Sequence, residues 1–99
     1  MKIEKIGLKD KTGKARVELV SPNCILGMAE VLTYGANKYK PNSWQNIDSP
    51  IDTHYAALLR HLLIWRAGET NDKETGLSHI KHVLTNAMFL LDHEEKNRK

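Results

Sequence analysis

The sequence has little cysteine and no long apolar run. Its single cysteine, Cys24, excludes a disulfide within the chain. No segment reaches the roughly 20 consecutive apolar residues of a transmembrane helix, and the first residues lack the apolar core of a secretory signal. We therefore expect a soluble, cytoplasmic protein that does not bind membranes.

Sheet-forming patterns are missing as well. No segment shows the sustained alternation of apolar and polar residues that strands have, and no internal repeat or low-complexity tract is present. The 99 residues suffice for one domain with a small core. This pattern predicts a mainly α fold, and we expect oligomerisation, as a homodimer or homotetramer, to complete a helical bundle.

Positive charge exceeds negative charge by a small margin. The chain has 15 Lys and Arg against 12 Asp and Glu, a net charge of +3 and a pI near 9.1. Much of the excess lies in the first 16 residues and in the last four. A polyanionic partner is compatible with this distribution, but solvated chain termini explain it more simply.

Three segments have the three-to-four-residue apolar spacing of helices. The first opens at Ser21-Pro22, a cap followed by proline at the first helical position, and runs to about residue 39. The second covers about residues 51–67 and is stopped by Gly68. The third covers about residues 77–93.

The segments around these helices have other patterns. Residues 1–20 mix charged and apolar residues and are predicted to form an extended or hairpin-like arm. Residues 41–50 are rich in turn formers and predict a loop, whose Trp44 should pack back onto the helices. Residues 94–99 should form a flexible basic tail. The helical domain is therefore expected to span residues 21–93.

Histidines and carboxylates gather around the turn between the second and third helices. Glu69 and Asp72 lie in this connector, and His79 and His82 share a face of the third helix within its apolar stripe. A buried histidine needs a partner and a buried carboxylate is costly, so one shared cation would satisfy both. The candidate metal ligands are His61, Glu69, Asp72 and His79.

The chemistry of these residues leaves two interpretations open. Oxygen-rich ligation with a few imidazoles suits Mg²⁺, Mn²⁺ or Co²⁺, whereas a closed structural zinc site would usually need more cysteine. Alternatively, His79 and His82 are core histidines whose partners are backbone groups, Asn86 or the loop carboxylates. In that case Asp72 would cap a turn.

Basic and aromatic residues are the candidates for ligand binding. Cationic side chains can contact phosphate oxygens, and aromatic rings can stack on a base. Gly13-Lys14 lacks the upstream glycine and the following Ser or Thr of a P-loop. The simpler alternatives are a solvated arm for Lys14 and Arg16 and a core position for Tyr39. The candidates are Lys14, Arg16, Lys38 and Arg60 for phosphate, and Tyr39, Trp44 and Asn86 for base or sugar.

Several separated blocks of the sequence resemble one family. These blocks are residues 13–22, 31–39, 42–44, 59–69, 74–79 and 86–90, together with Asp72 and His82. In order and spacing they are similar to the dATP/dGTP diphosphohydrolases related to MazG-type nucleotide pyrophosphohydrolases. The resemblance covers about residues 12–92, and because some relatives are phage-encoded, a phage origin is expected.

The resemblance implies an all-α, oligomeric enzyme with a MazG-like helical bundle. Such an enzyme uses a divalent metal to hydrolyse dATP, dGTP or both to the monophosphate and pyrophosphate. The wider superfamily binds metal through Glu-x-x-Glu on one helix and Glu-x-x-Asp on the next. The nearest equivalents here are Glu69-x-x-Asp72 and His79-x-x-His82, so this chain departs at both histidines. Glu69, Glu74 and His82 are the candidate catalytic residues, with Glu74 or His82 acting as the base that orients water.

Two other functions remain compatible with the residues. A small basic nucleic-acid-binding module with a structural histidine cluster would explain the charge but not the polar face of the third helix. A purely structural helical oligomer would leave the histidines and the acidic connector unexplained. We therefore expect a purine deoxynucleoside triphosphate as the partner, and no nucleic acid.

Overall fold

A computed structural model describes residues 13–98, and this part of the chain is helical, with no strand. The all-α prediction is confirmed. The part of the predicted arm that covers residues 1–12, and Lys99 of the predicted tail, lie outside the described residues. In chain order the elements are the 3₁₀ helix η1 (Val17–Leu19), α1 (Pro22–Lys38), the 3₁₀ helix η2 (Ser43–Asn46), α2 (Pro50–Arg66) and α3 (His79–Lys96).

Local signals explain where the helices begin. Pro22 and Pro50 occupy the first positions of α1 and α2, where a missing backbone N–H needs no partner. Ser78 caps α3, because its hydroxyl oxygen accepts a hydrogen bond from the backbone N–H of Ile80 at 3.1 Å. The first two helices match their predicted bounds within one residue, whereas α3 begins at His79, two residues later than predicted.

The C-terminal end of α3 also differs from the prediction. The helix was expected to end near residue 93, but it continues to Lys96. Its last turn carries an ion pair between Lys96 Nζ and Asp92 Oδ2, 2.8 Å apart and four residues apart in sequence. A cation at this end also interacts favourably with the helix dipole. Residues 94–96 of the predicted tail therefore belong to the helix.

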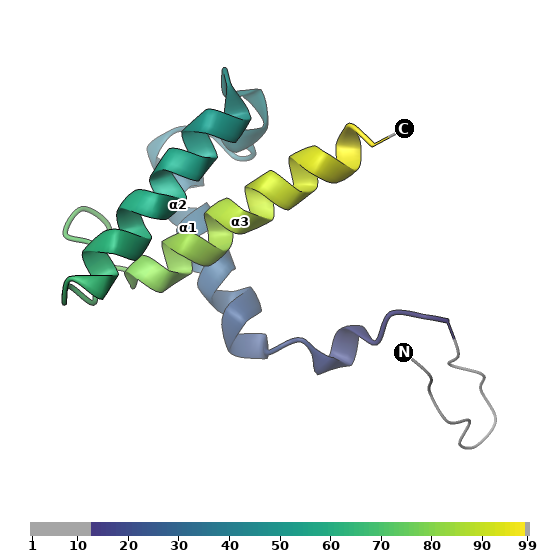
Figure 1. Cartoon of the computed structure of the whole chain (residues 1–99), viewed down its shortest axis with the longest axis horizontal. Coiled ribbons are helices and arrows are strands. Elements are labelled where there is room, and N and C mark those ends of the chain that lie inside the picture. The colour runs from purple at the N-terminus through teal and green to yellow at the C-terminus, as the bar shows by residue number, and fades with distance from the viewer. Residues whose placement is uncertain (1–12, 99) are drawn as a thin grey trace.

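α3 is the central helix. It packs along α2 and crosses α1 (Figure 1). The segment before α1 leads away from the α2–α3 pair and contains the 3₁₀ turn η1, so the predicted extended arm is wrong for residues 17–19. Within residues 13–98, no helix combines the length and the apolar character that crossing a bilayer requires.

The interior of the described chain is polar. Its buried side chains are those of His54, His79, His82, Thr85 and Asn86, and no apolar side chain among the described residues is fully buried. Every large apolar side chain of the three helices keeps some contact with solvent, and Leu91 of α3 is 57% exposed. One chain therefore covers its apolar stripes only in part, because three helices cannot cover all their apolar faces.

Candidate active site

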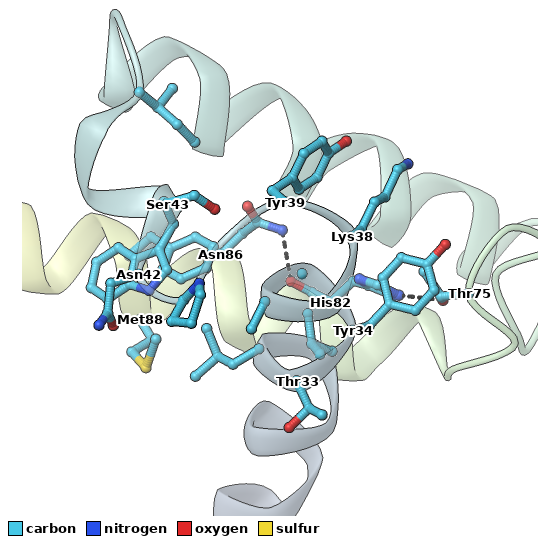
Figure 2. Close-up of a pocket in the computed structure, with 18 of the residues that line it drawn as sticks. Thr33, Tyr34, Lys38, Tyr39, Asn42, Ser43, Thr75, His82, Asn86 and Met88 are labelled. Atoms are coloured by element: carbon cyan, nitrogen blue, oxygen red, sulfur yellow. Dashed lines mark hydrogen bonds between the residues drawn. The ribbon is translucent and has the colours of Figure 1, made fainter.

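A cavity of about 730 Å³ lies between α1, η2, α2, the α2–α3 connector and α3. Figure 2 shows Tyr34, Lys38 and Tyr39 along the end of α1, with His82 and Thr75 at one end of the cavity. Its volume is typical of sites for small molecules and cofactors.

The cavity brings together most of the residues predicted from the sequence. The predicted residues that line it are Lys38, Tyr39, Trp44, Arg60, His61, Asp72, Glu74, His82 and Asn86. Glu69 and His79 do not line the cavity, although His79 contacts His61, which does. Lys14 and Arg16 lie in the segment before α1 and do not line it either, and Arg16 pairs with Glu18 at 2.8 Å.

A tight turn between α2 and α3 positions the acidic residues. The backbone N–H of Asp72 donates to the carbonyl of Leu77 at 2.8 Å, and Asn71 and Ser78 form an isolated antiparallel bridge. Gly68 has φ of 116° and Gly76 has φ of 74°, a left-handed region that glycine enters without strain. The turn therefore folds the connector back against the start of α3.

Three potential metal ligands converge beside the cavity. His61 on α2, Asp72 in the connector and His79 at the start of α3 each offer one ligand atom, all within 4.8 Å of one another. The Nδ1 atoms of His61 and His79 are 2.9 Å apart and form a hydrogen bond between the two rings. Two ligands bound to one ion at a right angle, each at about 2.1 Å, are separated by about 3 Å. The two imidazoles therefore fit adjacent positions around one divalent cation.

The partners of the two histidines also fit this arrangement. Nε2 of His79 is 2.9 Å from Oε1 of Glu69, and because a carboxylate only accepts, His79 donates its Nε2–H. A histidine that binds metal through one nitrogen commonly donates its other N–H to a carboxylate. Burial, aided by repulsion from His82, lowers the pKa of His61 to about 4 and keeps its ring neutral at pH 7.

Asp72 and His82 are joined through the hydroxyl of Thr75. Thr75 Oγ1 lies 2.9 Å from Asp72 Oδ2 and 2.8 Å from His82 Nε2. Burial opposes the charge of Asp72, but hydrogen bonds from the side chain and backbone of Thr75 outweigh it and lower the pKa of the carboxyl. Burial also lowers the pKa of His82, whose ring stacks on His61 with 4.3 Å between centroids. Asp72 therefore caps a turn and faces the histidines at once.

Lys38 and Glu74 form an ion pair at the surface of the cavity. Lys38 Nζ donates to Glu74 Oε2 at 2.7 Å, and the pair links the end of α1 to the connector. The hydrogen bond between the two side chains raises the pKa of Lys38 and lowers the pKa of Glu74. The neighbouring Tyr39 is 67% exposed, so the core position considered for it is wrong.

Aromatic rings form another part of the cavity wall. Trp44 stacks on Phe89, with ring centroids 4.6 Å apart and planes 19° apart, and its predicted packing onto the helices is confirmed. The buried ring of His54 also lies 4.6 Å from Phe89, and burial lowers its pKa. No site role had been predicted for His54, Thr75 or Phe89. The available signal for His54 was its position seven residues before His61, on the same helix face.

The fold and the site together define an all-helical protein with a histidine–carboxylate cluster beside a nucleotide-sized cavity. This chain belongs to the family described as dATP/dGTP diphosphohydrolase, N-terminal, whose sequence model matches residues 4–99. The family inferred from the sequence blocks is thereby confirmed.

A phage protein is similar to most of the chain. Over 84 residues, the chain is 34% identical to a dATP/dGTP diphosphohydrolase of Salmonella phage PMBT28. The aligned region is 85% of this chain but only 28% of that protein, so the chain spans less than a third of its relative. This similarity is compatible with the predicted phage origin. No solved structure gives a significant match.

Proposed function

We propose that this chain hydrolyses dATP, dGTP or both to the monophosphate and pyrophosphate, with the help of a divalent metal. One observation carries the proposal: the Nδ1 atoms of His61 and His79 meet 2.9 Å apart, close to Asp72, beside a cavity large enough for a nucleotide. Membership of the dATP/dGTP diphosphohydrolase family, together with the name of the phage relative, supports the reaction and the substrate class.

In this proposal His61, Asp72 and His79 hold the metal. Two imidazoles and one carboxylate favour Mn²⁺ or Co²⁺ over Mg²⁺, which prefers oxygen ligands. Such a metal, when bound, polarises phosphate oxygens and lowers the pKa of a bound water. Glu69, which the sequence suggested as a ligand and catalytic group, has one oxygen on His79 Nε2. We therefore propose that Glu69 orients the His79 ring.

The cations that line the cavity are assigned to the phosphates. Lys38 and Arg60 both lie in its wall and can neutralise phosphate oxygens. Lys14 and Arg16 do not line the cavity, so we propose that neither contacts a substrate that is bound within one chain. The base and sugar are assigned to the remaining wall, where Tyr39, Trp44 and Asn86 provide two aromatic rings and an amide.

Glu74 is the proposed base for the attacking water. In the described structure its carboxylate is paired with Lys38. Phosphate oxygens compete with Glu74 for that ammonium group, so a bound triphosphate would leave the carboxylate able to accept a proton. His82 is the alternative base, since it also lines the cavity.

Self-association is part of the proposal. Large apolar side chains remain exposed on each helix, including Leu26 on α1, Leu63 on α2 and Leu91 on α3. Contiguous exposed apolar surface on small domains is commonly covered by a partner. We infer that copies of the chain cover these faces as a homodimer or homotetramer.

A substrate panel tests the proposed function. Release of monophosphate and pyrophosphate would be measured with ribo- and deoxynucleoside triphosphates, in Mn²⁺, Co²⁺, Mg²⁺ or EDTA. The expected result is pyrophosphate from dATP or dGTP, highest with Mn²⁺ or Co²⁺ and absent in EDTA. Silence across the panel, together with salt-sensitive binding of nucleic acid that ignores Mn²⁺, would instead favour the nucleic-acid-binding module.

A further inference from the structure

The hydroxyl of Thr75 has an unusually complete set of partners for a residue in a short polar turn. Besides its contacts with Asp72 and His82, its oxygen accepts a hydrogen bond from the backbone N–H of Leu77 at 3.2 Å. The backbone N–H of Thr75 also donates to Asp72 Oδ2, at 3.0 Å. Figure 2 shows the link between Thr75 and His82 at one end of the cavity. The side chain of Thr75 thus links the turn between α2 and α3 to α3 itself through hydrogen bonds.

The chemistry of these groups determines the direction of each hydrogen bond. Thr75 has one hydroxyl proton, and an ionised carboxylate can only accept, so this proton goes to Asp72. The oxygen of Thr75 then has only lone pairs left to offer His82. Nε2 of His82 must therefore carry a proton and donate it, at 2.8 Å.

We propose that Thr75 is a positioning residue, which joins Asp72 to His82 and holds the His82 ring in the form protonated on Nε2. The role of Asp72 as a metal ligand rests on the proposed function, whereas the protonation of Nε2 does not. Because Nε2 is engaged as a donor, only Nδ1 of His82 is left to accept a proton. The fixed His82 ring also supports the His61 ring, whose plane lies within 7° of it.

A purely structural role is the competing explanation for Thr75. Its hydrogen bonds to Asp72 also close the turn, as does the bond from the backbone N–H of Gly76 to the carbonyl of Asp72 at 2.8 Å. A structural role alone predicts that loss of the hydroxyl changes stability only. The proposal predicts, in addition, changes in the protonated nitrogen of His82 and in metal affinity.

The first test reads the protonated nitrogen directly. Long-range ¹H–¹⁵N NMR spectra of the full, metal-free chain, labelled at histidine and recorded at one neutral pH, distinguish the two neutral ring forms. The wild-type protein should show His82 protonated on Nε2. Thr75→Ser keeps the hydroxyl and should keep this form, whereas Thr75→Val should lose its preference. A wild-type ring protonated on Nδ1 would overturn the proposal without any variant.

The second test measures Mn²⁺ affinity by calorimetry on the same proteins. Loss of a partner that orients a metal ligand commonly weakens binding by about 10- to 100-fold. Thr75→Val should weaken Mn²⁺ binding by about tenfold, and Thr75→Ser should restore it. Thr85→Val is the matched control, because the buried hydroxyl of Thr85 donates to the carbonyl of Lys81 in its own helix, at 2.8 Å.

The outcomes separate this inference from the proposed function. A wild-type chain that binds no Mn²⁺ would overturn the metal site and with it the effect of Thr75 on affinity, while the NMR spectrum still decides the state of His82. A wild-type chain that binds Mn²⁺, with unchanged affinity in a folded Thr75→Val variant, would overturn the positioning role alone. Thermal unfolding and circular dichroism establish that each variant is folded.

Discussion

The seam between α2 and α3 differs sharply from the outer faces of the same helices. The seam is buried and polar, with His54, His79 and His82 in it, whereas Leu63 and Leu91 are exposed on the outside. In the described part of the chain, every buried side-chain nitrogen and oxygen has a hydrogen-bond partner. Such complete pairing is needed because an unpaired buried polar group costs about 1–3 kcal/mol. The comparison teaches that this chain fills its interior with hydrogen-bonded polar side chains and leaves large apolar side chains on its surface.

The outer faces must then supply stability by another route. A small domain gains most of its stability from buried apolar surface, at about 25 cal/mol for each Å² removed from water. Here the large apolar side chains are at most partly buried within one chain, and contacts between copies would bury more of their surface. The seam should therefore respond to mutation through activity and the outer faces through assembly.

The largest effect is expected for Asp72→Asn. The change keeps the size of the side chain and an oxygen that can accept from Thr75, but it removes the charge that faces His61 and His79. Turnover of the preferred deoxynucleotide should fall by about 100-fold or more, with weaker Mn²⁺ binding. Steady-state kinetics and calorimetry measure both quantities. Asp52→Asn on α2 is the control, and equal activity in the two variants would remove Asp72 from the metal site.

A smaller effect is expected for Lys38→Gln. Loss of the ammonium group that reaches the cavity should raise KM about tenfold, because a charged hydrogen bond to phosphate is lost. Lys14→Gln serves as control, since Lys14 lies outside the cavity and its loss should leave KM unchanged. A larger rise in KM for Lys14→Gln would mean that the segment before α1 reaches an active site in the assembly.

The outer faces are tested by Leu63→Lys, which places a charge at a position that is 65% exposed in one chain. If another copy covers this face, light scattering should show a smaller assembly and the melting temperature should fall. Asn23→Lys, at an exposed polar position of α1, is the control for added charge. An unchanged mass and melting temperature would mean that this face of α2 stays open to solvent, and that self-association, if any, uses another face.

The smallest effect is the pH dependence of stability. Burial lowers the pKa of His61 from 6.5 to about 4, so between these values the unfolded chain binds more protons than the folded one. The contribution of His61 is therefore complete above pH 6.5 and is lost as the pH falls towards 4. The ring is only partly buried, and we expect a loss of about 1 kcal/mol between pH 7.5 and 5. Urea unfolding of metal-free protein measures it, and His61→Asn should reduce the slope.

Much of the fold could be predicted from the sequence, because helix signals are local. Proline at positions 22 and 50 and the apolar spacing placed α1 and α2 within one residue. The end of α3 was less predictable, since the polar residues 94–96 look like a tail until the ion pair of Lys96 is known. The sequence pattern also could not reveal that the large apolar side chains of the helices are at most partly buried within one chain, because burial depends on which faces the helices turn towards one another.

The candidate site was predicted as a set of residue types and not as a set of contacts. The cluster of His61, Asp72 and His79 lies within the predicted ligands, because a short connector between two helices brings such residues together. The pairing of Lys38 with Glu74 was not predicted, since 36 residues separate them. Thr75 was overlooked because one hydroxyl in a polar turn has no distinctive pattern.

The sequence by itself therefore determined the helical class, the family, and the residues from which the site is built. These properties follow from neighbouring residues, whose capping, spacing and chemistry act over a few positions along the chain. Only the tertiary structure decided that Glu69 accepts a hydrogen bond from His79 and that Asp72 lies close to both His61 and His79. It also decided which ring nitrogen of each histidine makes which contact. Such relations depend on how α2, the connector and α3 pack, and a hydrogen bond or a metal ligand requires positions accurate to a few tenths of an ångström.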